Sequence, residues 1–232
     1  MRDVGTDTLA EALVRNAAPT LTGVMPANLF TVPGRFVTRT EAEAAEVSQA
    51  RDALERQLAS CARELAPAGV ALRLMVWRGC GALVYAYRPA LLARHLHRPA
   101  TALPLIAAGY PAWDPERCLD RLAARIAARG KSAVLAGDGA PLAVGSMPPC
   151  TGCRRAADFP HEVGHLLGYP PADVAGFIRS RGQGYVLLGP WKVYADPAAA
   201  RRTFARIHES SARCLEGYRR GGGLAELAAA CA

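Results

Sequence analysis

Hydrophobic positions recur along this chain at two spacings, and each spacing predicts a different kind of element. Apolar residues three and four apart are typical of helices that bury one face, and short apolar runs between glycines and prolines are typical of strands. Strands are predicted at about 70–87, as a hairpin, and at about 184–194. Helices are predicted at 7–16, 40–65, 89–97, 99–108, 115–129, 159–167, 171–181 and 197–219.

Turn-forming and capping residues mark the ends of several of these elements. The hairpin is expected because Arg78-Gly79-Cys80-Gly81 separates its two apolar runs. Thr40 and Glu43 form a capping-box pattern at the start of the long helix. Gly130 is expected to end the helix that begins at residue 115.

The order of the elements favours a single α+β domain over residues 1–220, with a small, mostly antiparallel sheet packed with helices. Residues 130–158 are rich in glycine, proline and small side chains, so a long loop is expected there. Residues 221–232 are expected to form a frayed C-terminal tail.

A second glycine-proline pattern predicts a sharp corner. Gly168-Tyr169-Pro170-Pro171 separates two predicted helices, with glycine suited to the left-handed residue after one helix and proline to the first turn of the next. Gly182 is expected to end the second helix in the same way as Gly168 ends the first.

The segment that leads into this corner carries the sharpest chemical motif of the chain. His161, Glu162 and His165 fill H-E-x-x-H, in which two imidazoles one helical turn apart can hold zinc while the glutamate activates its water. A metzincin requires a third histidine where Pro171 stands, so the motif alone does not complete a hydrolase site. On a helical wheel His161 and His165 fall opposite the apolar side, which favours a surface or cleft position.

A structural zinc site is a second interpretation of the same region. Cys150, Cys153, His161 and His165 supply four zinc-type ligands within sixteen residues, although the spacing between the cysteines and histidines is shorter than in a zinc finger. The alternative is that the two cysteines are reduced loop thiols.

Polar residues in the last predicted strand form another candidate group. Because side chains alternate along a strand, Lys192 and Tyr194 share one side, and Trp191 and Val193 share the other. Lys192 and Tyr194 either lie on a solvated face or belong to a polar site near His161.

Several stretches together resemble the bacterial domain of unknown function 3793 family. They are FPHEVGHLLGYPPADVAGFI, GPWKVY, APTLTGVMPANLF and LVYAYRPALL. The resemblance implies that His161 and Glu162 belong to the family pattern, whereas His165 and the pair Cys150 and Cys153 do not. It supports the fold and the boundaries rather than an activity.

The net charge of +8 changes this picture little, because only Lys131 and Lys192 are lysines and the remaining basic residues are arginines. No nucleic-acid-binding motif accompanies the charge, so nucleic acid is not expected as a partner. No apolar run is long enough for a signal peptide or a membrane span, and seven scattered cysteines are typical of reduced thiols. A cytoplasmic protein without a membrane partner is expected.

These observations favour a small-ligand or metal-associated binding or accessory protein, with candidate functional residues His161, Glu162, Lys192 and Tyr194. No catalytic residue is identified, and zinc is the cofactor that the motifs suggest. A zinc-dependent hydrolase that uses HEVGH is the alternative. A basic module that binds a partner or nucleic acid is the second alternative.

Overall fold

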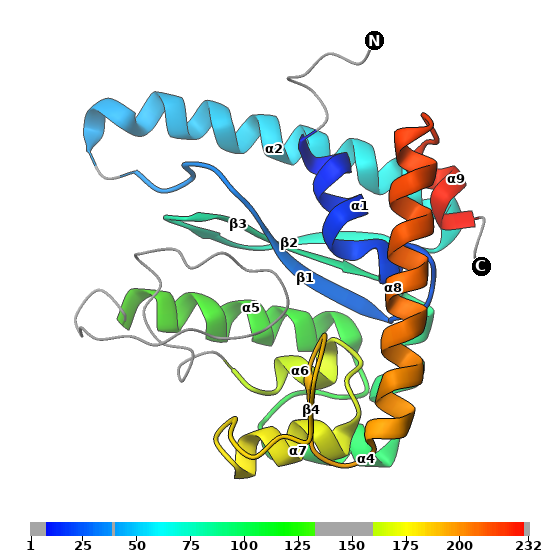
Figure 1. Ribbon diagram of the computed structural model, residues 1–232. Helices are drawn as coiled ribbons and strands as arrows, with labels where there is room; N and C mark the ends of the chain where they lie inside the picture. Colours follow the sequence, from blue (N-terminus) through cyan, green and yellow to red (C-terminus); the bar gives the residue numbers. More distant parts are fainter. Residues whose placement is uncertain (1–7, 39, 133–159, 230–232) are drawn as a thin grey trace. The chain divides into compact units, whose positions relative to one another are not determined.

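The computed structural model describes residues 8–38, 40–132 and 160–229 (Figure 1). Helices pack with a small antiparallel sheet, which confirms the predicted α+β class. The chain separates into two compact units. Unit 1 draws on the residues up to Arg88 and from Ser210 onward, and unit 2 consists of Pro89–Glu209. The domain boundaries inferred from the sequence, 1–220, stay a prediction.

Unit 1 contains a three-stranded antiparallel sheet in the order β1-β3-β2. The predicted hairpin is confirmed as β2 and β3, and the third strand comes from the N-terminal part of the chain rather than from 184–194. The central strand, β3, is buried at every position, which explains its continuous apolar run. The elements of this unit are α1 (Thr8–Leu21), β1 (Ala27–Val32), η1 (Glu41–Glu43), α2 (Ala44–Leu65), η2 (Ala66–Ala68), β2 (Ala71–Arg78), β3 (Gly81–Tyr87) and α9 (Leu224–Ala229).

The core of unit 1 lies between this sheet and the helices α1, α2 and α9. Alternate β3 residues, Ala82, Val84 and Ala86, point into it. Helix α1 is longer than predicted because its buried positions continue at helical spacing to Leu21. The side chain of Thr40 makes no capping hydrogen bond, so the predicted capping box does not form and a 3-10 turn precedes α2.

The C-terminal segment differs from the predicted frayed tail. Residues 224–229 form α9, in which Leu224, Leu227 and Ala228 are buried in the core of unit 1. Apolar spacing of three and four places these side chains on one face, so burial against α1 and α2 stabilises a helix too short to form alone.

A buried arginine joins the ends of three helical elements in unit 1. The Arg88 side chain, 9% exposed, donates to backbone carbonyls of α1, η2 and α9. Its Nε lies 2.8 Å from the Thr20 oxygen and its Nη1 2.9 Å from the Ala68 oxygen. Its Nη2 donates to Leu21 and, at 3.2 Å, to Ala228. These carbonyls lie at or near helix C-termini, where the helix dipole favours a cation.

Unit 2 is built almost entirely of helices. Its last predicted strand is reduced to two paired two-residue segments, because Gly189-Pro190 turns the chain between them and proline has no amide hydrogen to donate. Helix α5 continues through Gly130, and the predicted loop over 130–158 lies outside the described residues from 133 onward. The elements are α3 (Pro89–Leu96), α4 (Pro99–Ala107), α5 (Pro115–Ser132), α6 (Val163–Leu166), α7 (Pro171–Arg179), β4 (Leu187–Leu188), β5 (Lys192–Val193) and α8 (Pro197–Arg219), whose last residues belong to unit 1.

Across the described ranges, none of the helices is both long and apolar enough to cross a membrane.

The buried guanidinium gives the first prediction. We expect Arg88→Met to lower the free energy of unfolding by about 3–5 kcal/mol, since it leaves buried carbonyls without their donor. Urea denaturation followed by circular dichroism measures the change. Arg63→Met, at an exposed position of α2, is the matched control and should change stability by about 0.5 kcal/mol at most. Equal effects of the two substitutions would contradict this account of Arg88.

Candidate functional site

The predicted corner between α6 and α7 is present. Gly168 has φ +84°, and the Tyr169 amide donates to the Gly164 oxygen at 2.9 Å, which closes the C-terminus of α6. Pro171 occupies the first turn of α7. Helix α6 is shorter than the predicted 159–167, since it is a single turn that begins at Val163.

The glycine that follows α7 is also confirmed in its predicted role. Gly182 has φ +76°, and its amide donates to the Phe177 oxygen at 2.9 Å. Arg181, just before it, is the one residue other than glycine with a positive φ among the described residues, at +49°. The helix therefore ends in two consecutive left-handed residues, the second of which is glycine.

Two glycines let the elements of the corner approach closely. A Cβ on Gly164 of α6 would lie 2.8 Å from a methyl group of Val174. A Cβ on Gly176 of α7 would lie 2.5 Å from the side chain of Tyr194. Both glycines are therefore required for packing, which gives a structural reason for their places in the stretches HEVGHLLGYP and DVAGFI.

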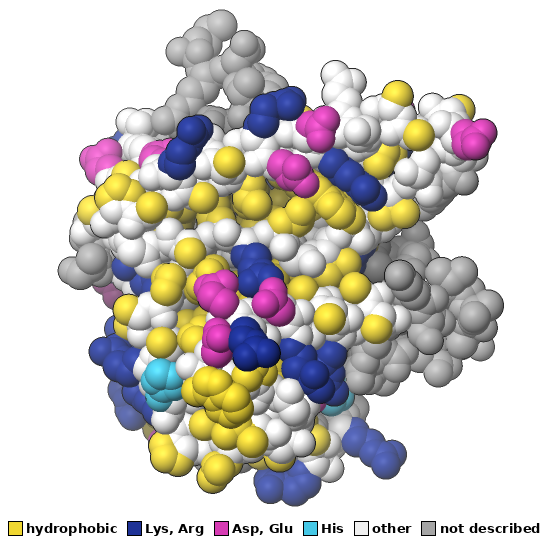
Figure 2. All heavy atoms as spheres, turned by 180° about the vertical axis from the view of Figure 1, so that it is seen from behind, with side chains coloured by type: hydrophobic (Ala, Val, Ile, Leu, Met, Phe, Trp, Pro, Cys, Tyr) yellow, Lys and Arg dark blue, Asp and Glu magenta, His cyan; other side chains and the backbone are white. Residues whose placement is uncertain are grey.

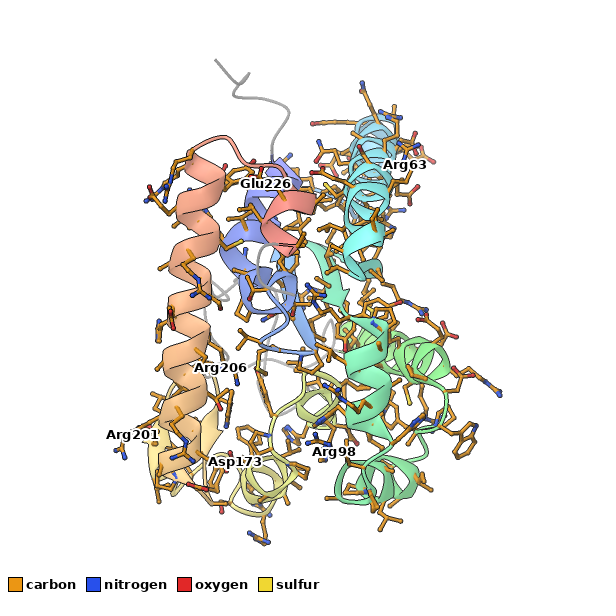
Figure 3. The ribbon with its side chains drawn as sticks, turned by 90° about the vertical axis from the view of Figure 1, so that its right-hand side faces the viewer. Arg63, Arg98, Asp173, Arg201, Arg206 and Glu226 are labelled. Atoms are coloured by element: carbon orange, nitrogen blue, oxygen red, sulfur yellow. The ribbon has the colours of Figure 1, made fainter. Side chains whose placement is uncertain are left out.

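A buried carboxylate attaches the segment 191–195 to α7. Asp173 is 3% exposed and accepts hydrogen bonds from Trp191 Nε1 at 2.8 Å, the Tyr194 amide at 2.8 Å and the Ala195 amide at 3.1 Å. Asp173 is labelled on α7 in Figure 3. Three donors offset the cost of burying one negative charge.

The ring of Trp191 is enclosed by two aromatic side chains. It stacks on Tyr169 of the corner with 5.0 Å between ring centroids and meets Phe204 of α8 edge-on at 4.6 Å. Trp191 and Val193 are buried while Lys192 and Tyr194 are half-buried, so the predicted alternation is confirmed.

Lys192, one of the candidate functional residues, holds the loop that follows α7. Its Nζ donates to the Gly182 oxygen at 2.8 Å and lies 4.9 Å from the centre of the Tyr185 ring. It is also 5.9 Å from the centre of the Phe177 ring, and the His161 imidazole lies 5.2 Å from the centre of the same ring. Phe177 therefore brings His161 and Lys192 together around one ring.

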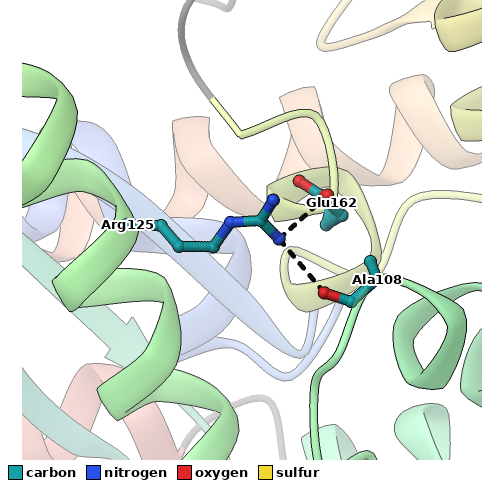
Figure 4. Close-up of polar contacts among 3 residues, drawn as sticks. All are labelled: Ala108, Arg125 and Glu162. Atoms are coloured by element: carbon teal, nitrogen blue, oxygen red, sulfur yellow. Dashed lines mark hydrogen bonds and ion pairs between the residues drawn. The ribbon is translucent and has the colours of Figure 1, made fainter.

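Glu162, the next candidate, points toward different partners. Its Oε1 accepts a hydrogen bond from Arg125 Nη1 at 3.1 Å, and the same nitrogen lies 3.4 Å from the Ala108 oxygen (Figure 4). The Arg125 guanidinium is 5.4 Å from the centre of the Tyr110 ring. The pKa of the Tyr110 hydroxyl is raised by burial and by the charge of Glu162.

His165 lies beside this pair and is buried. It is 2% exposed, and its Nδ1 has no hydrogen-bond partner among the described residues. Burial, and then the neighbouring His95, lower the pKa of His165 to about 4, while the charge of Glu162 acts in the opposite direction. The pKa of His95 is also lowered, first by burial and then by Arg98. We call His95, Tyr110, Arg125, Glu162 and His165 the polar cluster.

The burial of His165 corrects the position predicted from the helical wheel. The wheel assumed a continuous helix through 159–167, but α6 is one turn that packs against both α3 and α7. A single turn between two helices buries more than one side, so residues opposite its apolar stripe are also covered. His95 of α3, which is half-buried, takes part in the same contact.

An open groove lies between α4 and the first turns of α5. Its volume is about 670 Å³, and it contains Tyr110 of the polar cluster. Trp113 in its wall is 67% exposed. Figure 2 shows one face of the molecule, on which hydrophobic, basic and acidic side chains adjoin one another. The lining of this α4–α5 groove is Ile106, Gly109, Tyr110, Pro111, Trp113, Arg117, Asp120, Arg121 and Ala124.

The proposed metal ligands are only partly within the described ranges, because Cys150 and Cys153 lie outside them. Among the residues that the structure describes, no three His, Cys, Asp or Glu side chains lie close enough to hold a metal ion. His161 contacts Phe177, whereas His165 lies next to His95.

Sequence reasoning did not single out Tyr110, Trp113, Arg121 or Arg125. The available signal was the sequence GYPAW, in which two large aromatic residues stand in a short connection between helices. The link from Arg125 to Glu162 spans 37 positions and has no signature in the sequence.

A family model described as "Protein of unknown function (DUF3793)" matches residues 13–228. The match covers parts of both units and confirms the resemblance. Comparison with curated proteins finds no match, and comparison with solved structures finds none either.

The Asp173 contacts give a second prediction. Asp173→Asn should lower the free energy of unfolding by about 2–4 kcal/mol. The side-chain NH2 group of asparagine cannot accept a hydrogen bond, so at least one of the three N–H groups that now donate to Asp173 would lose its acceptor. Thermal and urea denaturation measure this loss. Asp196→Asn is the control, since that exposed residue caps α8 by accepting from the Ala199 amide at 2.9 Å, and asparagine can replace it in this role. Loss of stability in Asp196→Asn alone would contradict the prediction.

The buried imidazole gives a third prediction, on pH. The pKa of His165 is about 4 in the folded chain and about 6.5 unfolded, so between these values the unfolded chain binds more protons. The free energy of unfolding is therefore highest above pH 6.5, where His165 is neutral in both states. It falls by about 3 kcal/mol as the pH is lowered toward 4.

Urea denaturation at a series of pH values tests this dependence in the wild type and in His165→Gln, which removes the titrating group. The difference between the two profiles should appear between pH 6.5 and 4. His208→Gln, at an exposed position of α8, should follow the wild-type profile. A His165→Gln profile parallel to the wild type would refute the assignment.

Proposed function

The chain belongs to the DUF3793 family, and from that premise we propose that it is a small-ligand-binding protein whose ligand occupies the α4–α5 groove. The observation that carries the proposal is the position of Tyr110. This residue lines the groove and also stacks with Arg125, which in turn pairs with Glu162. The groove therefore adjoins a partly buried polar network that includes a residue of the family pattern.

The dimensions and lining of the groove support a small organic ligand. Ligand sites have volumes of about 300–1,000 Å³ and combine apolar walls with a few convergent polar groups. The groove has about 670 Å³ and offers Trp113, Ile106 and Pro111 as apolar wall beside arginine side chains. An indole that is 67% exposed loses hydration favourably when a ligand covers it.

The polar cluster supports the same location. It contains a buried imidazole nitrogen, on His165, that has no hydrogen-bond partner within the described part of the chain, and the pKa values of His95, Tyr110 and His165 are shifted. Buried groups with perturbed pKa values next to a concave surface are typical of functional sites. In the proposed function the cluster fixes Tyr110 and the arginines that stack on it, so that the groove is rigid before the ligand arrives.

Contacts of the H-E-x-x-H residues favour this function over a zinc-dependent hydrolase. In such a hydrolase the glutamate faces the zinc-bound water, and the two imidazoles converge on the metal. Here Glu162 pairs with Arg125, His161 contacts Phe177 and His165 adjoins His95. Elemental analysis of wild type, His165→Ala and Cys150→Ala tests the zinc alternatives. Zinc lost only in His165→Ala would support the hydrolase, and zinc lost in both would support a structural clip.

The fourth prediction tests the groove directly. Three flat probes of different charge, 2-naphthoate, 2-naphthalenemethanol and 2-naphthylmethylammonium, are titrated into the full chain by ligand-observed NMR. We expect at least one to bind, and Trp113→Ala to weaken it by about tenfold, as expected for the loss of an aromatic contact worth about 1.4 kcal/mol. Ile178→Ala, which removes another exposed apolar side chain of unit 2 outside the groove, should leave the affinity unchanged. Binding that is insensitive to Trp113→Ala would contradict the proposal.

A further inference from the structure

The charged side chains of the α4–α5 groove indicate which ligands it accepts. We infer that the groove selects planar aromatic anions, with the flat ring against Trp113 and a carboxylate or phosphate between Arg117 and Arg121. This inference rests on the proposed function, because it names the ligand class of the same groove.

Two arginines on one face of α5 supply the anion contacts. Arg117 and Arg121 are four positions apart, so they follow one another on the same side of the helix, and both line the groove. Asp120 is the one carboxylate among the lining residues. It is three positions after Arg117, on the same side of the helix, and lies about 100° around the helix from Arg121. The lining therefore carries two positive charges against one negative charge.

Arg121 is held in position without a ligand. Its guanidinium lies 5.9 Å from the centre of the Tyr110 ring, on which Arg125 also stacks. A Cβ on Gly109 would lie 2.8 Å from Arg121 Nη2, so the absence of a side chain there leaves room for the guanidinium against the backbone. The left-handed φ of +79° provides a second reason for glycine at this position. A pre-positioned guanidinium loses little side-chain freedom when it binds an anion.

The remaining lining favours a flat, apolar ligand body. Trp113 offers an exposed indole, and Ile106, Pro111 and Ala124 contribute apolar surface. Aromatic rings stack on indole and on guanidinium planes, so a planar molecule can contact Trp113 and Arg121 at the same time. A flexible aliphatic anion would satisfy the charges but lose conformational freedom on binding.

Isothermal titration calorimetry of the full chain with matched probes tests this inference. The probes are 2-naphthoate, 2-naphthyl phosphate and the neutral 2-naphthalenemethanol, so that the carboxylate and phosphate arms distinguish the two sources of negative charge. We expect at least one anion to bind about tenfold more tightly than the neutral probe, as two charge-assisted contacts at a partly exposed site predict.

Charge substitutions in the groove make the test specific. Arg117→Gln and Arg121→Gln should each lower the affinity for the anionic probe by about threefold to tenfold. The affinity for the neutral probe should change by about twofold at most. Asp120→Asn should raise the affinity for the anionic probe by about twofold to fivefold, because it removes a negative charge that repels the anion. Arg201→Gln is the control for lost positive charge, at an exposed position of α8 labelled in Figure 3. It should leave all affinities unchanged.

The outcomes separate this inference from the proposed function. Equal affinity for neutral and anionic probes, lost in Trp113→Ala, would overturn the anion selectivity and leave the ligand-binding function in place. Anion binding that Arg117→Gln and Arg201→Gln weaken equally would also overturn it, because the attraction would then come from net charge alone. Absence of binding by every probe would overturn both.

Discussion

The buried carboxylate of Asp173 is the constraint on which the corner between α6 and α7 depends. A charge that is removed from water is tolerated only when polar partners replace the lost hydration. Asp173 finds three donors, all in residues 191–195. This fixes one side of α7, and the Val174 side chain next to it packs against Gly164 on α6. Helix α6 in turn carries His165 and follows Glu162, so these two members of the polar cluster are positioned in part by a contact that neither of them makes.

Unit 1 also buries a charged side chain, and here the charge is positive. The buried guanidinium of Arg88 donates hydrogen bonds to backbone carbonyls at or near the ends of α1, η2 and α9. These carbonyls replace part of the hydration that the guanidinium loses on burial. Each element offers carbonyl groups that its own helix leaves unpaired. Arg88 thereby joins segments far apart in the sequence, including α9, which forms where a frayed tail was predicted.

The residues of the H-E-x-x-H motif are divided among different contacts. Glu162 forms an ion pair with Arg125, His165 is buried beside His95, and His161 shares the Phe177 ring with Lys192. The groove nearby is connected to this arrangement through Tyr110, which has arginines stacked on its ring. A stretch that resembles a metal site in sequence thus acts in the fold as a junction between helices.

The sequence by itself determined the features that depend on neighbouring residues. Gly168 and Pro171 predicted the corner, Gly182 the end of α7, and the apolar runs around Gly79-Cys80-Gly81 the hairpin, because local backbone preferences decide turns and caps. The α+β class and the family followed from the order of elements and from the stretches around the corner. Tertiary structure decided the rest. Whether β1 or the segment 184–194 joins the sheet, whether His165 is buried, and which residue faces Glu162 depend on contacts between segments tens of residues apart. Such contacts are chosen by packing and by the satisfaction of buried polar groups, which no local pattern encodes.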